Sequence, residues 1–141
     1  PASRDIWDLD RKNNSYRPIY ENELSDYVKR HLSEDIGKRG IVLGRESEIH
    51  RGEKTDIHVD TFKDKDDFLE HVSTIIEVKG CWNQELKTAM KSQLEDRYLK
   101  DNNCTHGIYL IGWFDCDLWD KDDPNYKNHQ GLVLKLQENC I

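Results

Sequence analysis

The sequence lacks the features that mark membrane, secreted and zinc-binding proteins. No apolar run approaches the roughly 18 residues that a membrane-spanning helix needs, so we expect no contact with a membrane. The first 20 residues are rich in charge and contain no apolar stretch of the kind found in signal peptides. The four cysteines include no Cys-x-x-Cys pair, which disfavours a zinc site. Scattered cysteines in a small domain are typical of reduced thiols, so the sequence predicts a cytoplasmic protein.

Apolar residues and proline are also scarce. The hydrophobic set makes up 35% of the chain, equal to the charged set, and there are only 3 prolines. Aromatic residues at 9% argue for a folded domain rather than a disordered chain. A length of 141 residues fits a single domain, 1–141. Because the chain begins at Pro1 rather than Met, we expect it to be part of a longer multidomain polypeptide.

The net charge of −7 on its own disfavours a nucleic-acid partner, which rewards a basic surface. The charge is uneven, however. Residues 115–123 hold five aspartates against one lysine, whereas residues 29–54 hold seven basic residues against five acidic ones. The acidity is therefore partly concentrated in one late loop.

Hydrophobic periodicity predicts a helix, three strands, a second helix and a fourth strand. The expected ranges are a helix at 22–37 with Asn22 as its N-cap, strands at 41–49, 54–62 and 74–80, a solvated loop at 63–67, a helix at 83–101, and a strand at 107–114 that is buried on both faces. Residues 1–21 are expected to form an irregular arm, and 125–141 a last helix or strand. This order predicts an α/β fold, a mixed central sheet flanked by helices, with its core at about 22–114.

Charged residues inside apolar strands are the most informative feature. Strand alternation puts Glu77 and Lys79 on one face of the strand at 74–80, where burial is costly unless the charges are paired or bind a metal. The strand at 54–62 supplies Asp56, and if the two strands pair, Asp56 and Glu77 converge. Two converging carboxylates favour a cation, and their hard oxygens select Mg²⁺ or Mn²⁺. The alternative is an ordinary cross-strand ion pair between Lys79 and Asp56.

The second predicted helix adds two polar residues. Its expected apolar stripe consists of Leu86, Ala89, Met90, Leu94 and Tyr98. At 100° per residue, Gln93 and Arg97 fall within this stripe and are aimed at the sheet. Buried polar side chains need partners, which a carboxylate and metal cluster would supply. The alternative is that Gln93 bonds to the backbone and that Arg97 reaches solvent along the edge of the stripe.

Three features follow one another in the chain: Asp56, then Glu77-Val78-Lys79, then a helix with Gln93 and Tyr98. Together they resemble the PD-(D/E)XK nuclease superfamily. The helix is similar to the glutamine-bearing helix of its RecB-like branch. The resemblance covers about 22–114 and implies a restriction-endonuclease-like fold with an α-β-β-β-α-β core. Two departures stand out: Thr55 replaces the proline of the motif name, and Gln93 and Tyr98 are one residue further apart than in the RecB-like pattern.

The resemblance also implies residue roles. Asp56 and Glu77 would bind one or two Mg²⁺ (or Mn²⁺), with the Val78 backbone carbonyl as a further ligand. Lys79 would position or activate the attacking water, and Gln93 would orient that water or a substrate phosphate. The family often adds a glutamate from the first helix. The candidates, among which the sequence does not choose, are Glu21, Glu23 and Glu34, and also Glu46 on the first strand.

These roles predict a metal-dependent endonuclease that hydrolyses phosphodiester bonds of DNA, with RNA left open as a substrate. The resemblance further implies an effector module of a larger bacterial antiviral defence protein, whose other domains would be its partners. A homodimer or higher oligomer is left open. Two alternatives remain: a non-catalytic nucleic-acid-binding domain on the same fold, and a protein-interaction domain that uses the acidic loop at 115–123.

Overall fold

The structure is a computed structural model that describes residues 4–36, 41–44, 57–65, 68–100, 104 and 106–138. Its elements, in chain order, are a 3-10 turn Arg4–Ile6, β1 Trp7–Asp10, β2 Ser15–Pro18, α1 Glu21–Ile36, β3 Ile41–Gly44, β4 Ile57–Lys65, β5 Phe68–Gly80, the π-helix η3 Met90–Leu99, β6 His106–Gly112 and α2 Pro124–Glu138. The predicted mixed α/β fold is confirmed, as is the order of helix, three strands, helix and strand from α1 to β6. None of the helices in these ranges has the length and apolar character needed to cross a membrane.

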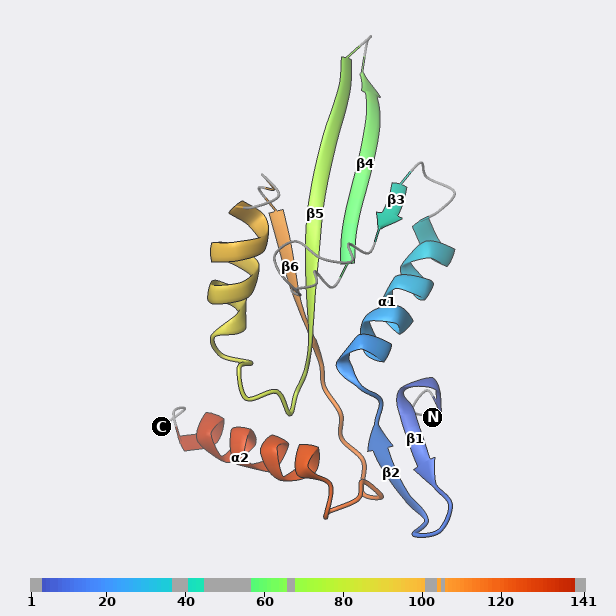
Figure 1. The fold of residues 1–141 in the computed structure, drawn as a ribbon, viewed down its shortest axis with the longest axis vertical. Coiled ribbons are helices and arrows are strands. Elements are labelled where there is room, and N and C mark those ends of the chain that lie inside the picture. Colours follow the sequence, from blue (N-terminus) through green and yellow to red (C-terminus); the bar gives the residue numbers. More distant parts are fainter. Residues whose placement is uncertain are drawn as a thin grey trace.

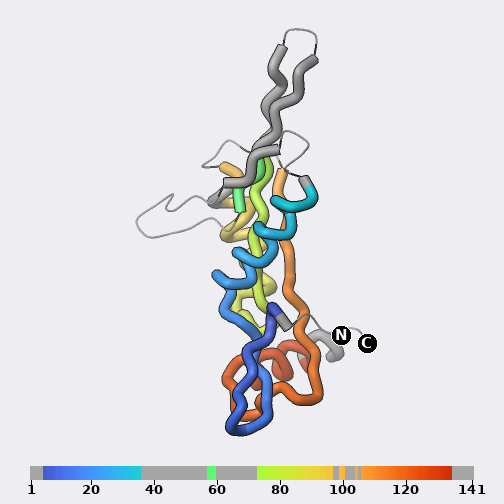
Figure 2. Tube along the Cα trace, turned by 90° about the vertical axis from the view of Figure 1, so that its right-hand side faces the viewer, coloured from blue at the N-terminus to red at the C-terminus, as the bar shows by residue number. Residues whose placement is uncertain are grey.

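The central sheet has the strand order β3-β4-β5-β6 (Figure 1). The β3–β4 and β4–β5 pairs are antiparallel, whereas β5 and β6 are parallel, with η3 in the connection between them. A parallel pair requires such a crossover, usually helical. Figure 2, turned by 90°, shows an elongated molecule in which α2 and the β1–β2 hairpin gather at one end.

Helices cover both faces of the sheet, and side-chain alternation along β5 supplies both cores. Ile76 and Val78 belong to the larger core, together with Ile57 of β4 and Leu24 of α1. Ile75 belongs to a smaller core with Leu94 of η3 and Cys104. Consecutive strand residues point to opposite faces, so Glu77 and Lys79 share the η3 face with Ile75.

The N-terminal arm is not irregular, as the sequence predicted, but begins with a β-hairpin. Trp7 pairs with Pro18 and Asp10 with Ser15, and Asn14 adopts a positive φ of 47° in the turn. Asparagine is one of the residues that tolerate this conformation. The hairpin is joined to distant residues by a bridge between Tyr16 and Trp119 and by ring contacts of Trp7.

Three element boundaries also differ from the prediction. α1 begins at Glu21, one residue earlier than predicted. Leu24 N–H donates to the Tyr20 carbonyl at 2.9 Å, and Tyr20 N–H donates to Glu23 Oε2 at 2.9 Å. These two hydrogen bonds make Tyr20, rather than Asn22, the N-cap. Residues 63–65 continue β4 instead of forming a loop, and β5 begins at Phe68. The C-terminal segment, for which helix and strand were both open, forms α2.

The second helix differs more fundamentally. Residues 84–88 form turns, and the hydrogen-bonded helix is of the π type from Met90 to Leu99. Because a π-helix bonds residue i to i+5, the 100° step of an α-helix does not describe its faces. Ala89 and Leu94 are buried as predicted, but Met90 is 57% exposed, so its assignment to the apolar stripe is wrong.

Strand β6 also differs from the prediction. The sequence predicts a strand buried on both faces at 107–114, but this prediction is wrong: Ile108 is 50% exposed, Ile111 42% and, just beyond the strand, Trp113 54%. The reason is position, because β6 is the last strand in the order β3-β4-β5-β6 and pairs with β5 alone among the described strands. An uninterrupted apolar run is typical of an inner strand, not of an edge.

Candidate functional site

The candidate site is built around two charged side chains on β5, the central strand. The Lys79 ammonium lies 2.8 Å from Glu77 Oε1, and the two side chains are only 12% and 1% exposed. Val78, between them, is buried and contributes to the core on the opposite face. The sequence therefore placed the two charges correctly on one face. That Val78 offers its carbonyl to a metal stays a prediction.

Burying this ion pair costs free energy, and this cost is the reason why the pair indicates a functional site. Taking a carboxylate and an ammonium out of water costs several kcal/mol per ion, and their attraction repays this only with good geometry. Apolar side chains of the same size would fill the space at lower cost, so a buried ion pair is weak evidence for a purely stabilising role. Lys79 pairs with Glu77. The alternative of a Lys79–Asp56 ion pair stays a prediction, because Asp56 lies outside the described residues.

Asp56, the other predicted carboxylate, lies outside the described residues. Its neighbour in the chain, Ile57, pairs with Ile76, the residue before Glu77. Within the described ranges, no group of three or more His, Cys, Asp or Glu side chains is arranged to hold a metal ion. Mg²⁺ commonly uses only one or two carboxylates and keeps several waters. The Glu77 carboxylate thus has the right donor chemistry for Mg²⁺, and Asp56 as a second ligand stays a prediction.

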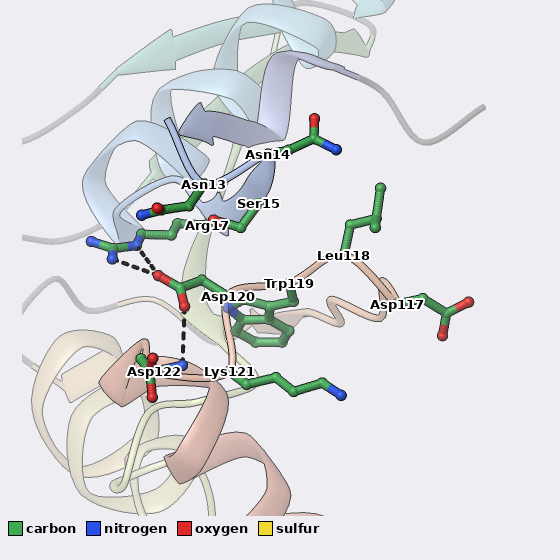
Figure 3. Close-up of a pocket in the computed structure, with 10 residues that line it drawn as sticks. All are labelled: Asn13, Asn14, Ser15, Arg17, Asp117, Leu118, Trp119, Asp120, Lys121 and Asp122. Atoms are coloured by element: carbon green, nitrogen blue, oxygen red, sulfur yellow. Dashed lines mark hydrogen bonds and ion pairs between the residues drawn. The ribbon is translucent and has the colours of Figure 1, made fainter. Parts of the chain in front are cut away.

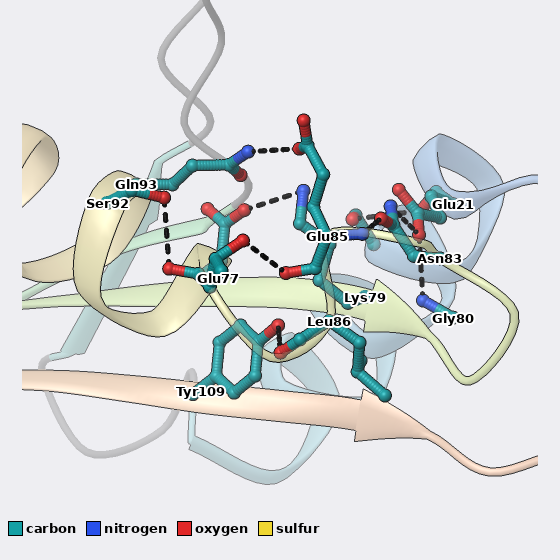
Figure 4. A network of polar contacts seen from close by, with 12 residues as sticks. Glu21, Glu77, Lys79, Gly80, Asn83, Glu85, Leu86, Ser92, Gln93 and Tyr109 are labelled. Carbon is teal, nitrogen blue, oxygen red and sulfur yellow. Dashed lines mark hydrogen bonds and ion pairs between the residues drawn. The ribbon is translucent and has the colours of Figure 1, made fainter. Parts of the chain in front are cut away.

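Gln93 lies close to this pair, but its amide has another partner. It is half-buried on η3 and donates from Nε2 to Glu85 Oε2 at 2.7 Å. Figure 4 shows Gln93, Glu85, Glu77 and Lys79 gathered on one side of β5. The proposed role of Gln93 toward water or phosphate stays a prediction. The side chains of Arg97 and Tyr98 lie outside what the structure describes.

Among the first-helix candidates, Glu21 is the one that reaches β5. Its Oε1 accepts hydrogen bonds from Gly80 N–H at 2.9 Å and from Asn83 Nδ2 at 2.8 Å. Glu23 is occupied in capping its own helix, Glu34 is exposed near His31, and Glu46 lies outside the described residues. The sequence did not single out Glu21 because the helical phase was judged from Leu24, while its useful property is its place in the first turn.

The contacts continue from Glu21 to η3. Asn83 Oδ1 accepts from Glu85 N–H at 2.8 Å, and Glu85 Oε2 accepts from Gln93. One line of hydrogen bonds therefore joins the start of α1, the turn after β5 and η3 (Figure 4). These contacts fix the three elements that surround Lys79.

Tyr109 of β6 is a site neighbour that the sequence did not indicate. It is the β6 residue opposite Glu77, and its hydroxyl donates to the Leu86 carbonyl at 2.8 Å. Burial raises the pKa of Tyr109 to about 12; the Lys79 ammonium lowers it, while the carboxylates of Glu77, Glu21 and Glu85 raise it further. One ammonium and three carboxylates thus influence the pKa of this phenol. A tyrosine within an apolar run gives no sequence signal of this kind.

The acidic loop is bound to the rest of the protein. The Arg17 guanidinium contacts Asp120, with Nε 3.0 Å from Oδ2, and this hydrogen bond holds the pKa of Asp120 below its usual value. Asp123 is buried, accepts from Trp119 Nε1 at 3.0 Å, and also accepts from Asn125 N–H at the start of α2. A polar pocket of about 400 Å³ lies between this loop and the hairpin turn at Asn13 and Asn14 (Figure 3). Part of the acidity at 115–123 therefore serves internal contacts.

Comparison with known proteins places the chain in a family without indicating an activity. No curated protein and no solved structure matches it. A family model described as a domain of unknown function, DUF8371, matches residues 2–115, a range that contains Asp56, Glu77, Lys79 and Gln93. Because this match spans most of the 141 residues, the chain belongs to the DUF8371 family of domains of unknown function.

Proposed function

We propose that this domain is a metal-dependent nuclease of the PD-(D/E)XK type, with a restriction-endonuclease-like fold, that hydrolyses phosphodiester bonds of DNA. The observation that carries the proposal is the buried Glu77–Lys79 pair on β5, the strand that η3 connects to β6. A buried acid and ammonium two residues apart on a central strand are unfavourable for stability alone, and they are the groups that this chemistry uses.

The metal would be Mg²⁺ or Mn²⁺, held by Glu77 and Asp56 and by the Val78 carbonyl. When bound, such an ion lowers the pKa of water and neutralises charge on the phosphate. Lys79 would position the attacking water and offset negative charge as the phosphorus–oxygen bond to the leaving group breaks. The leaving oxygen takes up a proton, so that the products are a phosphate monoester and a hydroxyl.

The surrounding residues would hold this arrangement in place. Glu21 binds the end of β5 through Gly80 N–H and the following turn through Asn83. This contact supports the choice of Glu21 as the first-helix glutamate of the site. In the present structure its Oε1 is engaged by these two donors, so its first role would be to position Lys79 rather than to bind the metal.

The two alternatives predict different behaviour. A non-catalytic domain on the same fold would bind nucleic acid without cutting it. A protein-interaction domain using 115–123 would show no metal dependence, and the internal contacts of Asp120 and Asp123 reduce the charge that this loop presents to a partner.

The test is DNA cleavage with and without Mg²⁺ or Mn²⁺, on duplex and single-stranded substrates and on RNA. The variants are Asp56→Asn, Glu77→Gln and Lys79→Met, with Lys87→Met as a matched control because Lys87 is exposed on the turn before η3. We expect metal-dependent cutting by the wild type and the control, and a loss of 100-fold or more in the three site variants. Calorimetry of Mn²⁺ binding gives a second readout, and we expect the affinity to fall in Asp56→Asn and Glu77→Gln.

Cleavage that persists in all three site variants, or that ignores the metal, contradicts the proposal. Metal-independent DNA binding without any cleavage favours the non-catalytic alternative. Circular dichroism of each variant confirms that a loss of activity is not a loss of fold.

A further inference from the structure

The side-chain amide of Gln93, which the proposed reaction uses to hold water or a phosphate, is bound to a carboxylate in this structure. Its Nε2 donates to Glu85 Oε2 at 2.7 Å. Figure 4 shows both side chains on the same side of β5 as the Glu77–Lys79 pair. A carboxylate offers anionic oxygens to a hydrogen-bond donor, as a phosphate does. The Glu85 side chain therefore has the acceptor chemistry of the substrate group that Gln93 would hold.

The turn that carries Glu85 is held by backbone contacts rather than by the Glu85 side chain. Glu85 N–H donates to Asn83 Oδ1 at 2.8 Å, and the Glu85 carbonyl accepts from Ala89 N–H at 2.8 Å. Asn83 is in turn bound to Glu21 through its Nδ2. Because these contacts leave out the Glu85 carboxylate, that group can rotate away from Gln93 while the turn keeps its shape.

Stability gives little reason for a carboxylate at this place. Glu85 is exposed, and a single hydrogen bond that orders two long side chains at a surface is largely offset by their loss of conformational entropy. The carboxylates of Glu77, Glu21 and Glu85 all raise the pKa of Tyr109, so the three negative charges act on one region, where Lys79 offsets only part of them. An arriving anion that binds Gln93 can therefore displace Glu85 at low cost.

We propose that Glu85 occupies the phosphate subsite of the candidate site and is displaced by a phosphate of the nucleic-acid strand. This inference rests on the proposed nuclease function. On displacement, Gln93 Nε2 donates to a phosphate oxygen instead of to Glu85 Oε2, so that one hydrogen bond replaces another and no covalent bond changes. Glu85 thus competes with the substrate from within the chain and regulates its access to the Glu77–Lys79 pair.

The test is the affinity for a fluorescein-labelled oligodeoxynucleotide, measured by fluorescence anisotropy. Ca²⁺ replaces Mg²⁺ to limit cleavage, because it also takes oxygen ligands but without the strict octahedral geometry of Mg²⁺. Glu85→Ala removes the competing acceptor, and we expect it to bind about fivefold more tightly than the wild type, or better. Glu95→Ala is the matched control for charge: Glu95 is exposed on η3, and its loss should change the affinity by less than about twofold.

A double-mutant cycle with Gln93→Ala separates competition from charge. If Glu85 competes for the Gln93 amide, Glu85→Ala in the Gln93→Ala background should gain no more affinity than Glu95→Ala does. If only the charge of Glu85 matters, its removal tightens binding equally in both backgrounds. The NMR signals of the Gln93 side-chain amide provide a second readout. They should shift in Glu85→Ala, and also when the oligonucleotide binds to the wild type.

Equal gains in the two backgrounds overturn the inference, as does a Glu85→Ala variant that binds no better than Glu95→Ala. So do Gln93 amide signals that stay in place when the oligonucleotide binds. If one of these results accompanies metal-dependent cleavage, only the role of Glu85 fails and the proposed function stands. A gain that depends on Gln93, without any cleavage, supports the phosphate subsite and contradicts the nuclease. If neither the wild type nor Glu85→Ala binds or cuts nucleic acid, both proposals fail.

Discussion

The Glu77–Lys79 ion pair leads to a prediction about stability that does not depend on any activity. Replacing Lys79 by Met keeps most of the side-chain volume but removes the ammonium 2.8 Å from a carboxylate that is almost fully buried. Removing one partner of a buried ion pair typically costs about 3–5 kcal/mol, because the remaining charge stays out of water. Lys79→Met should therefore lower the free energy of unfolding by about that amount, a large part of the roughly 5–15 kcal/mol that holds a domain together.

A second substitution separates the charge effect from lost packing. In the double variant Glu77→Met/Lys79→Met both charges are replaced by apolar side chains of similar length. Such replacements are often neutral or stabilising relative to the ion pair. The double variant should therefore be more stable than Lys79→Met alone, although it carries one substitution more.

Urea denaturation monitored by tryptophan fluorescence provides the measurement, since the chain has 4 tryptophans. Lys87→Met is the control for an exposed lysine and should change stability by no more than about 0.5 kcal/mol. The reasoning is refuted if Lys79→Met matches this control, or if the double variant is the less stable of the two. Either result would mean that Glu77 is better solvated than its burial indicates.

Further predictions concern backbone space and alkaline pH. A Cβ at Gly80 would lie 2.5 Å from the buried Trp82 ring, so Gly80→Ala should lower the free energy of unfolding by about 1–3 kcal/mol. A Cβ at Gly131 in α2 would meet no atom within 4 Å, so Gly131→Ala should raise the free energy of unfolding by roughly 0.5–1 kcal/mol. Urea denaturation measures both changes. Burial raises the pKa of the Cys81 thiol from 9.0 to about 11 and that of Tyr109 from 10.0 to about 12. As the pH rises, the unfolded chain therefore loses these protons before the folded protein does, and the free energy of unfolding should fall from about pH 9 upward. Tyr109→Phe should remove the part of this fall that begins near pH 10, and a midpoint that stays constant to pH 12 would contradict both shifts. At pH 8, Cys81 should resist alkylation in the folded protein and react after urea is added, as mass spectrometry would show.

The sequence predicted well those features that depend on strand alternation. Glu77 and Lys79 were placed on one face because side chains alternate along any strand, whatever its neighbours are. Leu94 was placed correctly in a buried stripe, but Met90 was not, because the period of the helix changes at η3. No residue pattern distinguishes a π-helix from an α-helix at this level.

Features that depend on distant contacts were missed. The β1–β2 hairpin is fixed by the bridge between Tyr16 and Trp119, more than a hundred residues away in the chain, and its strands are only four residues long. The apolar run at 107–114 was interpreted as an inner strand, although burial depends on the place of β6 in the sheet. The sequence could not choose Glu21 among the candidate glutamates and did not indicate Tyr109, because their importance arises from the turn at Asn83 and from the register with Glu77.

The net charge of −7 has a different meaning once its location is known. Asp120 and Asp123 serve contacts far from β5, so they say little about the candidate site. Among the described residues, however, three carboxylates and one ammonium act on the pKa of Tyr109, and the sum of these four charges is negative. A phosphodiester could approach this face only if a cation offset that charge, since like charges repel strongly where water is partly excluded. The divalent ion of the proposed nuclease would therefore offset the charge of Glu21, Glu77 and Glu85 and so help to admit the substrate, as well as help to hydrolyse it.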